Sequence, residues 1–492
     1  MITLALSVTL LVTGFLVYGR VADRFFGMDP ARETPAYTKK DGIDYVPMKG
    51  WRVFMIQFLN IAGLGPIFGA ILGAMYGPVV YIWIVAGCIF MGATHDYFSG
   101  MLSMRHGGAS LPELVGTYLG RYMRGFLRVF TLLLLLFVGV AFVSGPAKLL
   151  YTLSGFSLPF WMGLIFFYYI LATLLPIDKI IGLLYPFFGG ALIFMAVGIL
   201  AGIVVKWAGG SLELMELTPA TLRNFQPDAL TNSIFPFLFI VVSCGAISGF
   251  HATQSPLMAR CLKSERQGRN IFYGAMIAEG IVAIIWATAA MNYMGDVHGL
   301  NYAFTHPLAS NPDIKPDPAW LVNEICRSWL GKTGAVIAVI GVVACPVTSG
   351  DTAFRSARLT IADMLKIPQK KISSRLVIMV PVFALAFILT FMMKDEFARI
   401  WKFVGISNQT LAAITCWTIA MYLGMKGKNH LMMSVPALFL TAVCITYILA
   451  APHSGGGLAM PVKSSVIIAV ACTAAIMALF IVTLRKKKGK GQ

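Results

Sequence analysis

Charged residues are scarce in this 492-residue chain. Asp, Glu, Lys and Arg together make up 12% of the sequence, whereas hydrophobic residues make up 58%. A soluble domain carries about 25% charged residues, so this chain has too few to cover the surface of a soluble globule of its size. The scarcity excludes an ordinary cytosolic enzyme and a disordered chain. It predicts an all-α polytopic membrane protein.

Motifs of catalysis, metal binding and nucleic-acid binding are also lacking. The eight cysteines form no CxxC pair and most fall inside apolar runs, which argues against disulfides and zinc motifs. The sequence contains no GxSxG, no HExxH and no phosphate-binding Gly-Lys-Ser/Thr loop. We therefore expect no enzyme activity, no cofactor and no nucleic-acid partner. The net charge of +18 is explained by basic cytoplasmic loops of a membrane protein.

Long apolar runs are abundant, and a run of about 20 residues is enough to cross a bilayer. We predict thirteen spans: Met1–Tyr18, Phe54–Met75, Val79–Met104, Phe126–Ser144, Leu158–Leu175, Ile180–Val205, Ile234–Phe250, Ile271–Asn292, Thr333–Thr348, Leu376–Met393, Ile400–Leu423, Leu431–Ala450 and Ser464–Leu484. An external N-terminus places most of the 39 Lys and Arg residues in cytoplasmic loops, as the positive-inside rule requires. The basic tail should then contact anionic lipid headgroups.

Two of these spans contain Gly and Pro clusters at their middle. Such clusters open the helix backbone, and within a bilayer the freed groups need a ligand, an ion or water as partner. The alternative is close helix packing through small residues. The residues that we assign to a substrate site at the two breaks are Asn60, Ala62, Gly63, Gly65, Cys244, Gly245, Ser248 and His251, joined by Asn408 and Gln409 of the eleventh span.

The spacing of the breaks predicts the topology. They lie in spans two and seven, and spans five apart cross the membrane in opposite directions. This favours a LeuT-like fold with two inverted five-helix repeats. The expected segments are an N-terminal helix (1–19), a cytoplasmic segment (20–52), repeat one (53–206), repeat two (207–424), two further helices (425–485) and a basic tail (486–492).

Several ionisable or hydroxyl side chains occur at membrane depth. A charge at the bilayer centre costs about 2.5–3.5 kcal/mol, so each one needs a reason. The candidates for proton or ion coupling are His95, Asp96, Glu279, Thr348, Ser349, Asp351 and Thr352. A sodium ion near Gly63, Ser349 and Thr352 is an alternative to proton coupling. Asp351 could instead form a structural ion pair with Arg355, four residues along a helix.

These segments resemble the carbon starvation protein A (CstA) family of transporters. RETPAYTKKDGIDYVPMKGW (Arg32–Trp51) is similar to the family's R-x-TPA…DG-x-DYVP segment, and IFPFLFIVVSCGAISGFH, beginning at Ile234, is similar to P-x-LFITIACGAISGFH. Glu279 falls where the family has Glu in GGMLMES, and KFVGISNQTLAA resembles LFGIANQ-LLAA. His95 and Pro112 depart from the family's Gln and Gly.

The resemblance implies carbon-starvation-linked uptake of small nutrients, namely peptides or pyruvate-like carboxylates, across a bacterial inner membrane. It also implies the same LeuT-like fold. We therefore predict a symporter driven by protons or sodium, with a small-molecule substrate between the two breaks. A passive channel and a membrane ligand sensor are the alternatives.

Overall fold

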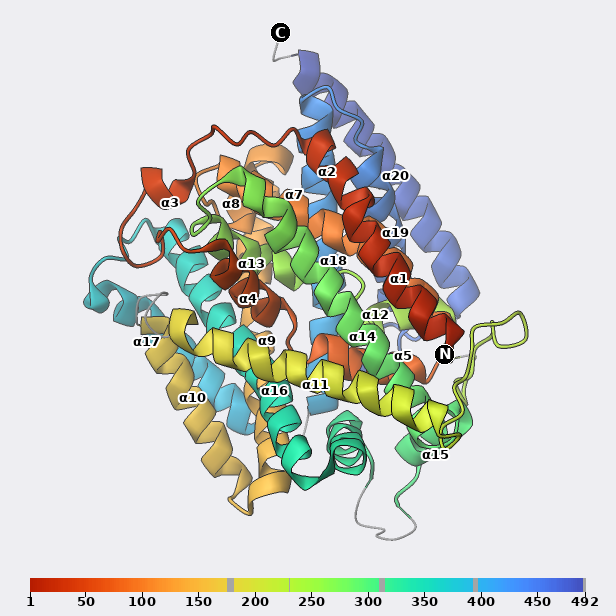
Figure 1. Ribbon diagram of the computed structural model, residues 1–492. Helices are drawn as coiled ribbons and strands as arrows, with labels where there is room; N and C mark the ends of the chain where they lie inside the picture. Colours follow the sequence, from red (N-terminus) through yellow and green to blue (C-terminus); the bar gives the residue numbers. More distant parts are fainter. Residues whose placement is uncertain (175–180, 230, 309–314, 393–396, 490–492) are drawn as a thin grey trace.

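The computed structural model describes residues 1–492 except 175–180, 230, 309–314, 393–396 and 490–492. The described part contains helices and no strand (Figure 1). Nine of these helices are long and apolar enough to cross a membrane, or ten if one bent pair is a single span. The prediction of an all-helical polytopic protein is therefore confirmed. The predicted span ends at Leu175, Ile180 and Met393 and the last residues of the tail lie outside the described residues.

The first part of the chain forms the N-terminal helices and the first broken span. Its elements are α1 (Ile2–Leu16), α2 (Tyr18–Phe26), α3 (Pro35–Thr38), α4 (Gly50–Ile61), η1 (Gly65–Gly69), α5 (Ala70–Ala74), α6 (Val79–Ala86), η2 (Gly87–Gly92), α7 (Ala93–Arg105), α8 (Leu111–Leu119), α9 (Arg121–Ser154), α10 (Leu158–Leu174) and α11 (Ile181–Ala208).

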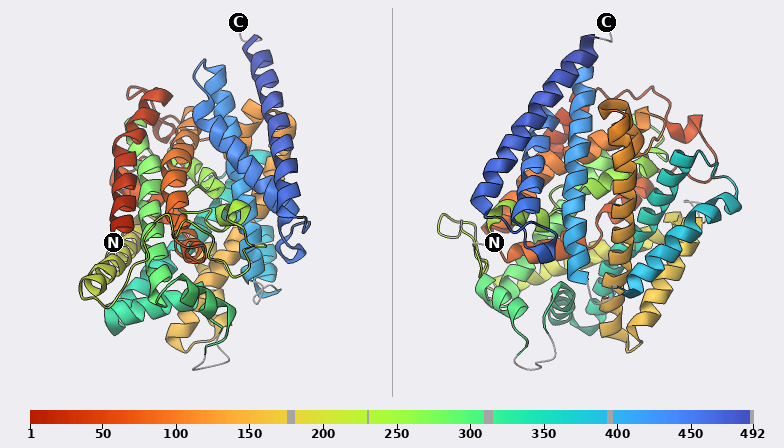
Figure 2. Two further views of the ribbon diagram at one scale, coloured as in Figure 1. Left: turned by 90° about the vertical axis from the view of Figure 1, so that its right-hand side faces the viewer. Right: turned by 180° about the vertical axis from the view of Figure 1, so that it is seen from behind.

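The second part contains the other broken span and the C-terminal helices. Its elements are η3 (Ile234–Leu238), α12 (Phe239–Val241), α13 (Gly249–Ala259), η4 (Glu265–Gln267), η5 (Arg269–Tyr273), α14 (Gly274–Tyr293), α15 (Val297–Thr305), α16 (Pro318–Leu365), α17 (Ile372–Met392), α18 (Phe397–Met425), α19 (Leu431–Ala450), η6 (His453–Gly455) and α20 (Val462–Gly489). Figure 2 shows α20 rising to the C-terminus along α19, with which it packs.

Helix α16 is longer than the sequence predicted. The predicted span Thr333–Thr348 lies within it, and the helix continues through Asp351 and Arg355 to Leu365. Its beginning is interrupted at Gly331, whose φ of +67° is left-handed. The polar residues after Thr348 are buried against neighbouring helices and keep their helical geometry.

Both predicted helix breaks are present. The first separates α4 from η1 and α5 at residues 62–64, where the chain bends by 53°. The second separates α12 from α13 at residues 242–248. Gly245 has a φ of +87° there, a conformation that residues with a Cβ rarely adopt. Pro66 follows the first break and cannot donate a backbone hydrogen bond.

The two breaks pack directly against each other. A Cβ atom on Gly65 would lie 2.1 Å from Cys244 Cβ, and one on Gly245 would lie 3.8 Å from Pro66 Cα. Close packing through small residues and an opened backbone are therefore combined at one place rather than being alternatives. Helix α14 packs against α4, η1 and α5, while α18 packs against α12 and α13 (Figure 1). The breaks thus lie at the centre of the bundle.

Candidate functional site

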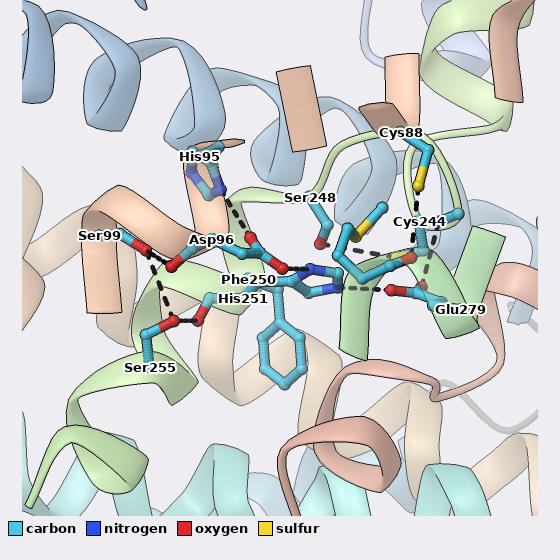
Figure 3. A network of polar contacts seen from close by, with 12 residues as sticks. Cys88, His95, Asp96, Ser99, Cys244, Ser248, Phe250, His251, Ser255 and Glu279 are labelled. Atoms are coloured by element: carbon cyan, nitrogen blue, oxygen red, sulfur yellow. Dashed lines mark hydrogen bonds and ion pairs between the residues drawn. The ribbon is translucent and has the colours of Figure 1, made fainter. Parts of the chain in front are cut away.

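A chain of ionisable side chains lies beside the second break (Figure 3). His95 and Asp96 come from α7, His251 from α13 and Glu279 from α14, and all four are buried. Asp96 joins both imidazoles: its Oδ1 lies 2.8 Å from His95 Nδ1 and its Oδ2 lies 2.8 Å from His251 Nδ1. The other ring nitrogen of His251, Nε2, lies 3.5 Å from Glu279 Oε2. The sequence named all four residues, and the structure connects them.

Glu279 links this chain to the opened backbone. The N–H of Gly245, within the second break, donates to Glu279 Oε1 over 3.1 Å. A carboxylate is a stronger acceptor for an N–H than a neutral carboxyl, because hydrogen bonds with an ionised partner are roughly twice as strong. The protonation state of Glu279 therefore bears directly on the stability of the break.

Asn408 and Gln409 of α18 bind the two helices on either side of the second break. Asn408 Oδ1 accepts from Phe250 N (2.6 Å) and from Ser248 Oγ (3.1 Å), so its amide caps the start of α13. Gln409 Nε2 donates to the carbonyl of Phe239 in α12 over 2.6 Å. The backbone donors that we expected to bind substrate at this break are therefore bound by Asn408 and Glu279 in this conformation.

The first break offers an amide with free hydrogen-bonding capacity. Within the part of the chain that the structure describes, neither Asn60 Oδ1 nor Asn60 Nδ2 has a hydrogen-bond partner, and the same holds for the amide of Gln57. Both side chains are buried. Ala62 and Gly63 follow in the break itself and add no polar side chain. Asn60 and Gln57 are thus placed to bind a polar ligand, and Gln57 was not predicted.

Four oxygen atoms meet where α4 ends beside α16. Ser349 Oγ lies 3.1 Å from the carbonyl of Leu59 and 2.9 Å from that of Cys345, and Thr348 Oγ1 lies 3.3 and 2.8 Å from the same two carbonyls. A Cβ on Gly63 would lie 3.2 Å from Ser349 Oγ, so the first break adjoins this cluster. Thr352 does not join it, because its hydroxyl bonds the carbonyls of Thr348 and Ser349.

Asp351 is bound by tyrosines rather than by Arg355. The hydroxyl of Tyr168 donates to Asp351 Oδ2 over 2.8 Å, and that of Tyr185 lies 3.0 Å from the same atom. Asp351 is buried and stands apart from the Asp96–Glu279 chain. Arg355 is oriented toward Asp44, with Nη1 3.2 Å from Asp44 Oδ1.

Asp44 anchors the segment between α3 and α4, and the sequence analysis did not single it out. Its carboxylate also binds Arg358, whose Nη2 lies 2.9 Å from Oδ1. All three residues are buried. Burial raises the pKa of Asp44, but the positive charges of Arg358, Arg355 and Arg260 outweigh it and hold the pKa below its ordinary value. Asp44 lies in DGIDYVP, a motif that could have pointed to it.

Two neighbouring cavities border the second broken helix. The larger has a volume of about 470 Å³ and is bordered by Lys148, Asp317 and Lys402 as well as by apolar side chains. A smaller one of about 20 Å³ is bordered by Cys244, Phe250 and Asn408. Trp401 and Gly405 border both. Trp401 and Gly405 therefore lie where the two cavities adjoin.

Gly249 tests how tightly the start of α13 must fit. A methyl group there would lie 2.3 Å from the backbone N of Ala412 and 2.4 Å from the carbonyl O of Asn408. Neither backbone atom can move alone, so we expect Gly249→Ala to cost about 1–3 kcal/mol and to lower the melting temperature in detergent.

The matched control for this substitution is Gly190→Ala in α11, where nothing lies within 4 Å of the added methyl group. Ala favours a helix over Gly, so this variant should melt at the wild-type temperature or above. Equal melting temperatures for the two variants would show that α13 does not pack closely on α18.

Sequence comparison identifies the family. The chain matches the family model described as Carbon starvation protein CstA over residues 1–152, 146–306 and 319–447. The chain belongs to the CstA family. It is a member of a transporter family and not an enzyme, and the resemblance noted in the sequence is confirmed.

Curated relatives of this CstA-family chain include proteins of known and unknown activity. It is 45% identical over 344 residues to an uncharacterized membrane protein of Haemophilus influenzae, covering 61% of this chain and 92% of the relative. It is 27% identical over 344 residues to the pyruvate/proton symporter BtsT of Escherichia coli, covering 58% of this chain and 48% of BtsT. It is 26% identical over 553 residues to the peptide transporter CstA of Helicobacter pylori, covering 87% and 79%. The matched part is thus about half the length of BtsT.

Solved structures show the fold. A Na⁺-coupled sialic acid symporter superposes with a TM-score of 0.56 at 14% identity, covering 96% of this chain and 97% of the symporter. The manganese transporter of Eremococcus coleocola superposes with a TM-score of 0.53 at 13% identity, covering 91% and 99%. The CstA-family chain is therefore structurally similar to LeuT-like transporters.

Proposed function

We propose that this protein is a secondary active transporter that takes up small carboxylates or peptides by cation-coupled symport. The observation that carries the proposal is the buried chain from Asp96 through His251 to Glu279, which ends on the backbone N–H of Gly245 in a helix break. Intramembrane ionisable residues that contact one another are typical of proton pathways. The pyruvate/proton activity of BtsT and the peptide activity named for other relatives are consistent with it.

Coupling follows from the contact between Glu279 and Gly245. A bound proton neutralises the carboxylate and weakens its hold on the N–H, so protonated and deprotonated proteins favour different conformations of the break. A ligand shifts a conformational equilibrium only through its differential affinity for the two states. Proton binding at Glu279 meets this condition, because the Gly245 hydrogen bond differs between the states.

A second cation site is supported by the four oxygens of Leu59, Cys345, Thr348 and Ser349. Two carbonyls and two hydroxyls form a set of hard oxygen ligands of the kind that alkali and alkaline-earth cations prefer. Sodium bound there would hold the end of α4 against α16. Sodium coupling is therefore the alternative form of the proposal. In this form Gly63 in the first break and Ser349 in α16 lie next to the bound sodium ion.

The substrate class is inferred from the approach to the breaks. The larger cavity is bordered by charged side chains of both signs, namely those of Lys148, Lys402 and Asp317. A carboxylate or a peptide with charged ends carries groups that can interact with such a lining. We place the substrate beyond Trp401, near Asn60, Cys244 and Ser248. Asn60 then supplies the amide that hydrogen-bonds a carboxylate or peptide group.

Contacts between loops support the predicted grouping of the loops on two sides of the membrane, and the positive-inside rule then favours an external N-terminus and a cytoplasmic C-terminus. Loops predicted on the same side touch each other. The outer contacts are Met1 with Glu216 and Asn301 with Phe225, and the inner ones are Arg105 with Glu265, Lys428 with Phe26 and Lys487 with Tyr118. The proposal keeps the thirteen predicted crossings, arranged as two inverted five-helix repeats with one helix before them and two after them. It also keeps the location in a bacterial inner membrane.

Uptake into proteoliposomes tests the proposal. Labelled pyruvate and a labelled dipeptide are offered while the pH and sodium gradients are varied separately. We expect saturable accumulation of one substrate that follows one gradient. Accumulation indifferent to both gradients would reject symport, and a non-saturating current would favour a channel.

The sodium form of the proposal makes its own prediction for Ser349→Ala. Loss of one hydroxyl ligand to a charged ion costs about 1.5–3 kcal/mol, so the sodium concentration for half-maximal uptake should rise at least about tenfold. Ser356→Ala removes a buried hydroxyl on the same helix that donates to Thr253 instead, and serves as the control. An unchanged sodium dependence in Ser349→Ala would exclude this site.

A further inference from the structure

The side chains of Cys244, His251 and Glu279 bring three chemically different ligand groups together (Figure 3). The Sγ of Cys244, a ring nitrogen of His251 and a carboxylate oxygen of Glu279 all lie within 4.8 Å of one another. Within this set, His251 Nε2 and Glu279 Oε2 are 3.5 Å apart. Metal–ligand distances of about 2.0–2.3 Å around a tetrahedral zinc ion separate ligand atoms by three to four ångström. Small side-chain adjustments would therefore bring all three atoms into a coordination sphere.

Two of these ligand atoms lack any hydrogen bond. His251 Nε2 and Glu279 Oε2 are buried and, among the described residues, neither makes a hydrogen bond; their contact is the 3.5 Å ion pair with each other. Buried polar atoms are nearly always hydrogen-bonded, so two adjacent exceptions that face each other indicate a place for a bound species. The opposite atoms of the same side chains are well held, by Asp96 on His251 Nδ1 and by Gly245 N on Glu279 Oε1. Such second contacts orient metal ligands.

The ligand types select the class of ion. A thiolate, an imidazole and a carboxylate suit zinc and its chemical relatives, whereas calcium and magnesium prefer oxygen alone. Three protein ligands leave the fourth position open to water. The larger cavity is the nearest approach to this site, because Cys244 borders the small cavity that shares Trp401 and Gly405 with it.

We propose that Cys244, His251 and Glu279 bind a divalent cation of the zinc class, which reaches them from the larger cavity. The bound ion would fasten the second break to α14. It would also occupy the nitrogen and oxygen atoms through which His251 and Glu279 face each other. Inhibition of uptake by external zinc follows if these residues carry the coupling proton, so this consequence, unlike the binding itself, rests on the proposed function.

Binding is measured with cobalt(II) on the full chain purified in detergent. A Cys472→Ser background removes the exposed thiol. We expect a thiolate-to-cobalt charge-transfer absorption that disappears when zinc is added, because zinc displaces the cobalt ion. The absorption should increase with pH, because the ligands must lose protons to bind the metal. Cys244→Ser should abolish the absorption and weaken zinc binding at least about 100-fold. Cys88→Ser should retain both, because that buried thiol bonds the Met276 carbonyl instead.

Other outcomes decide against the proposal. Absorption that persists in Cys244→Ser, or no absorption in the parent protein, would overturn the site. Glu279→Gln keeps the thiolate of Cys244, so it should show the same absorption at lower intensity. This second variant tests the site even if Cys244→Ser fails to fold. Proteoliposome uptake with and without external zinc tests inhibition separately. Zinc binding without inhibition of uptake would overturn the inhibitory role alone. Absence of uptake under any gradient would count against the proposed function alone.

Discussion

Glu279→Gln is expected to uncouple uptake from the proton gradient. With one proton per substrate, a gradient of one pH unit supports about a tenfold substrate accumulation, because each 1.4 kcal/mol corresponds to a factor of ten. Gln cannot exchange a proton, yet its amide oxygen can still accept from Gly245 N. The break is then fixed in one protonation-independent form. Steady-state accumulation should fall from about tenfold to about equality between the two compartments.

Counterflow exchange separates uncoupling from misfolding. Exchange of labelled for unlabelled substrate needs no net proton movement, so Glu279→Gln should retain it while gradient-driven accumulation is lost. Glu213→Gln removes a carboxylate from an exposed outer loop and serves as the matched control, with wild-type accumulation expected. Full proton-driven accumulation by Glu279→Gln would show that the Asp96–His251–Glu279 chain does not carry the coupling proton.

Asp44→Asn is expected to cause the largest loss of stability. It leaves Arg355 and Arg358 buried without the carboxylate that binds both. Removing one partner of a buried ion pair costs about 3–5 kcal/mol, because the remaining charge loses its compensation. The melting temperature in detergent should fall markedly at pH 7. The segment between α3 and α4 should also become more accessible to protease, since Asp44 holds it against α16.

The pKa of Asp44 predicts how the stability loss in Asp44→Asn depends on pH. The pKa of Asp44 is lowered in the folded protein from an ordinary value of 3.8, so its stabilising effect is complete above that value and is lost as the pH falls through the lowered pKa. The difference between wild type and Asp44→Asn should therefore be constant near neutrality and shrink only in acid. Glu33→Gln, at an exposed position just before α3, should change stability by less than about 0.5 kcal/mol. A similar loss in both variants would contradict the role of Asp44.

The partners of Asp351 and Arg355 show what helical spacing alone does not determine. Asp351 and Arg355 are four apart on one helix, which permits an ion pair, but each faces a different neighbour: Asp351 meets Tyr168 and Tyr185, and Arg355 meets Asp44. Helical spacing states which pairs are possible. Partners from other helices decide which pair forms, because they determine which donors and acceptors lie within reach of each buried side chain.

The second break shows a similar limit. Gly245 and Ser248 marked it in the sequence, but Asn408 and Glu279 occupy its backbone donors in this conformation. Hydrogen-bonding capacity left unused lies instead at Asn60 and Gln57, of which only Asn60 was predicted. Gln57 sits in an ordinary apolar run, so its local sequence gave no signal.

The amino-acid sequence by itself determined the helical membrane class, the position of both helix breaks and the ionisable residues at membrane depth. These depend on local composition: apolar length, Gly and Pro, and the cost of a charge in hydrocarbon. Only the tertiary structure decided that His251 meets Asp96 and Glu279, that Asp44 meets two arginines of α16, and that Cys244 lies beside His251 and Glu279. Those contacts join residues far apart in the chain, and their geometry depends on how the helices pack rather than on any spacing along the sequence.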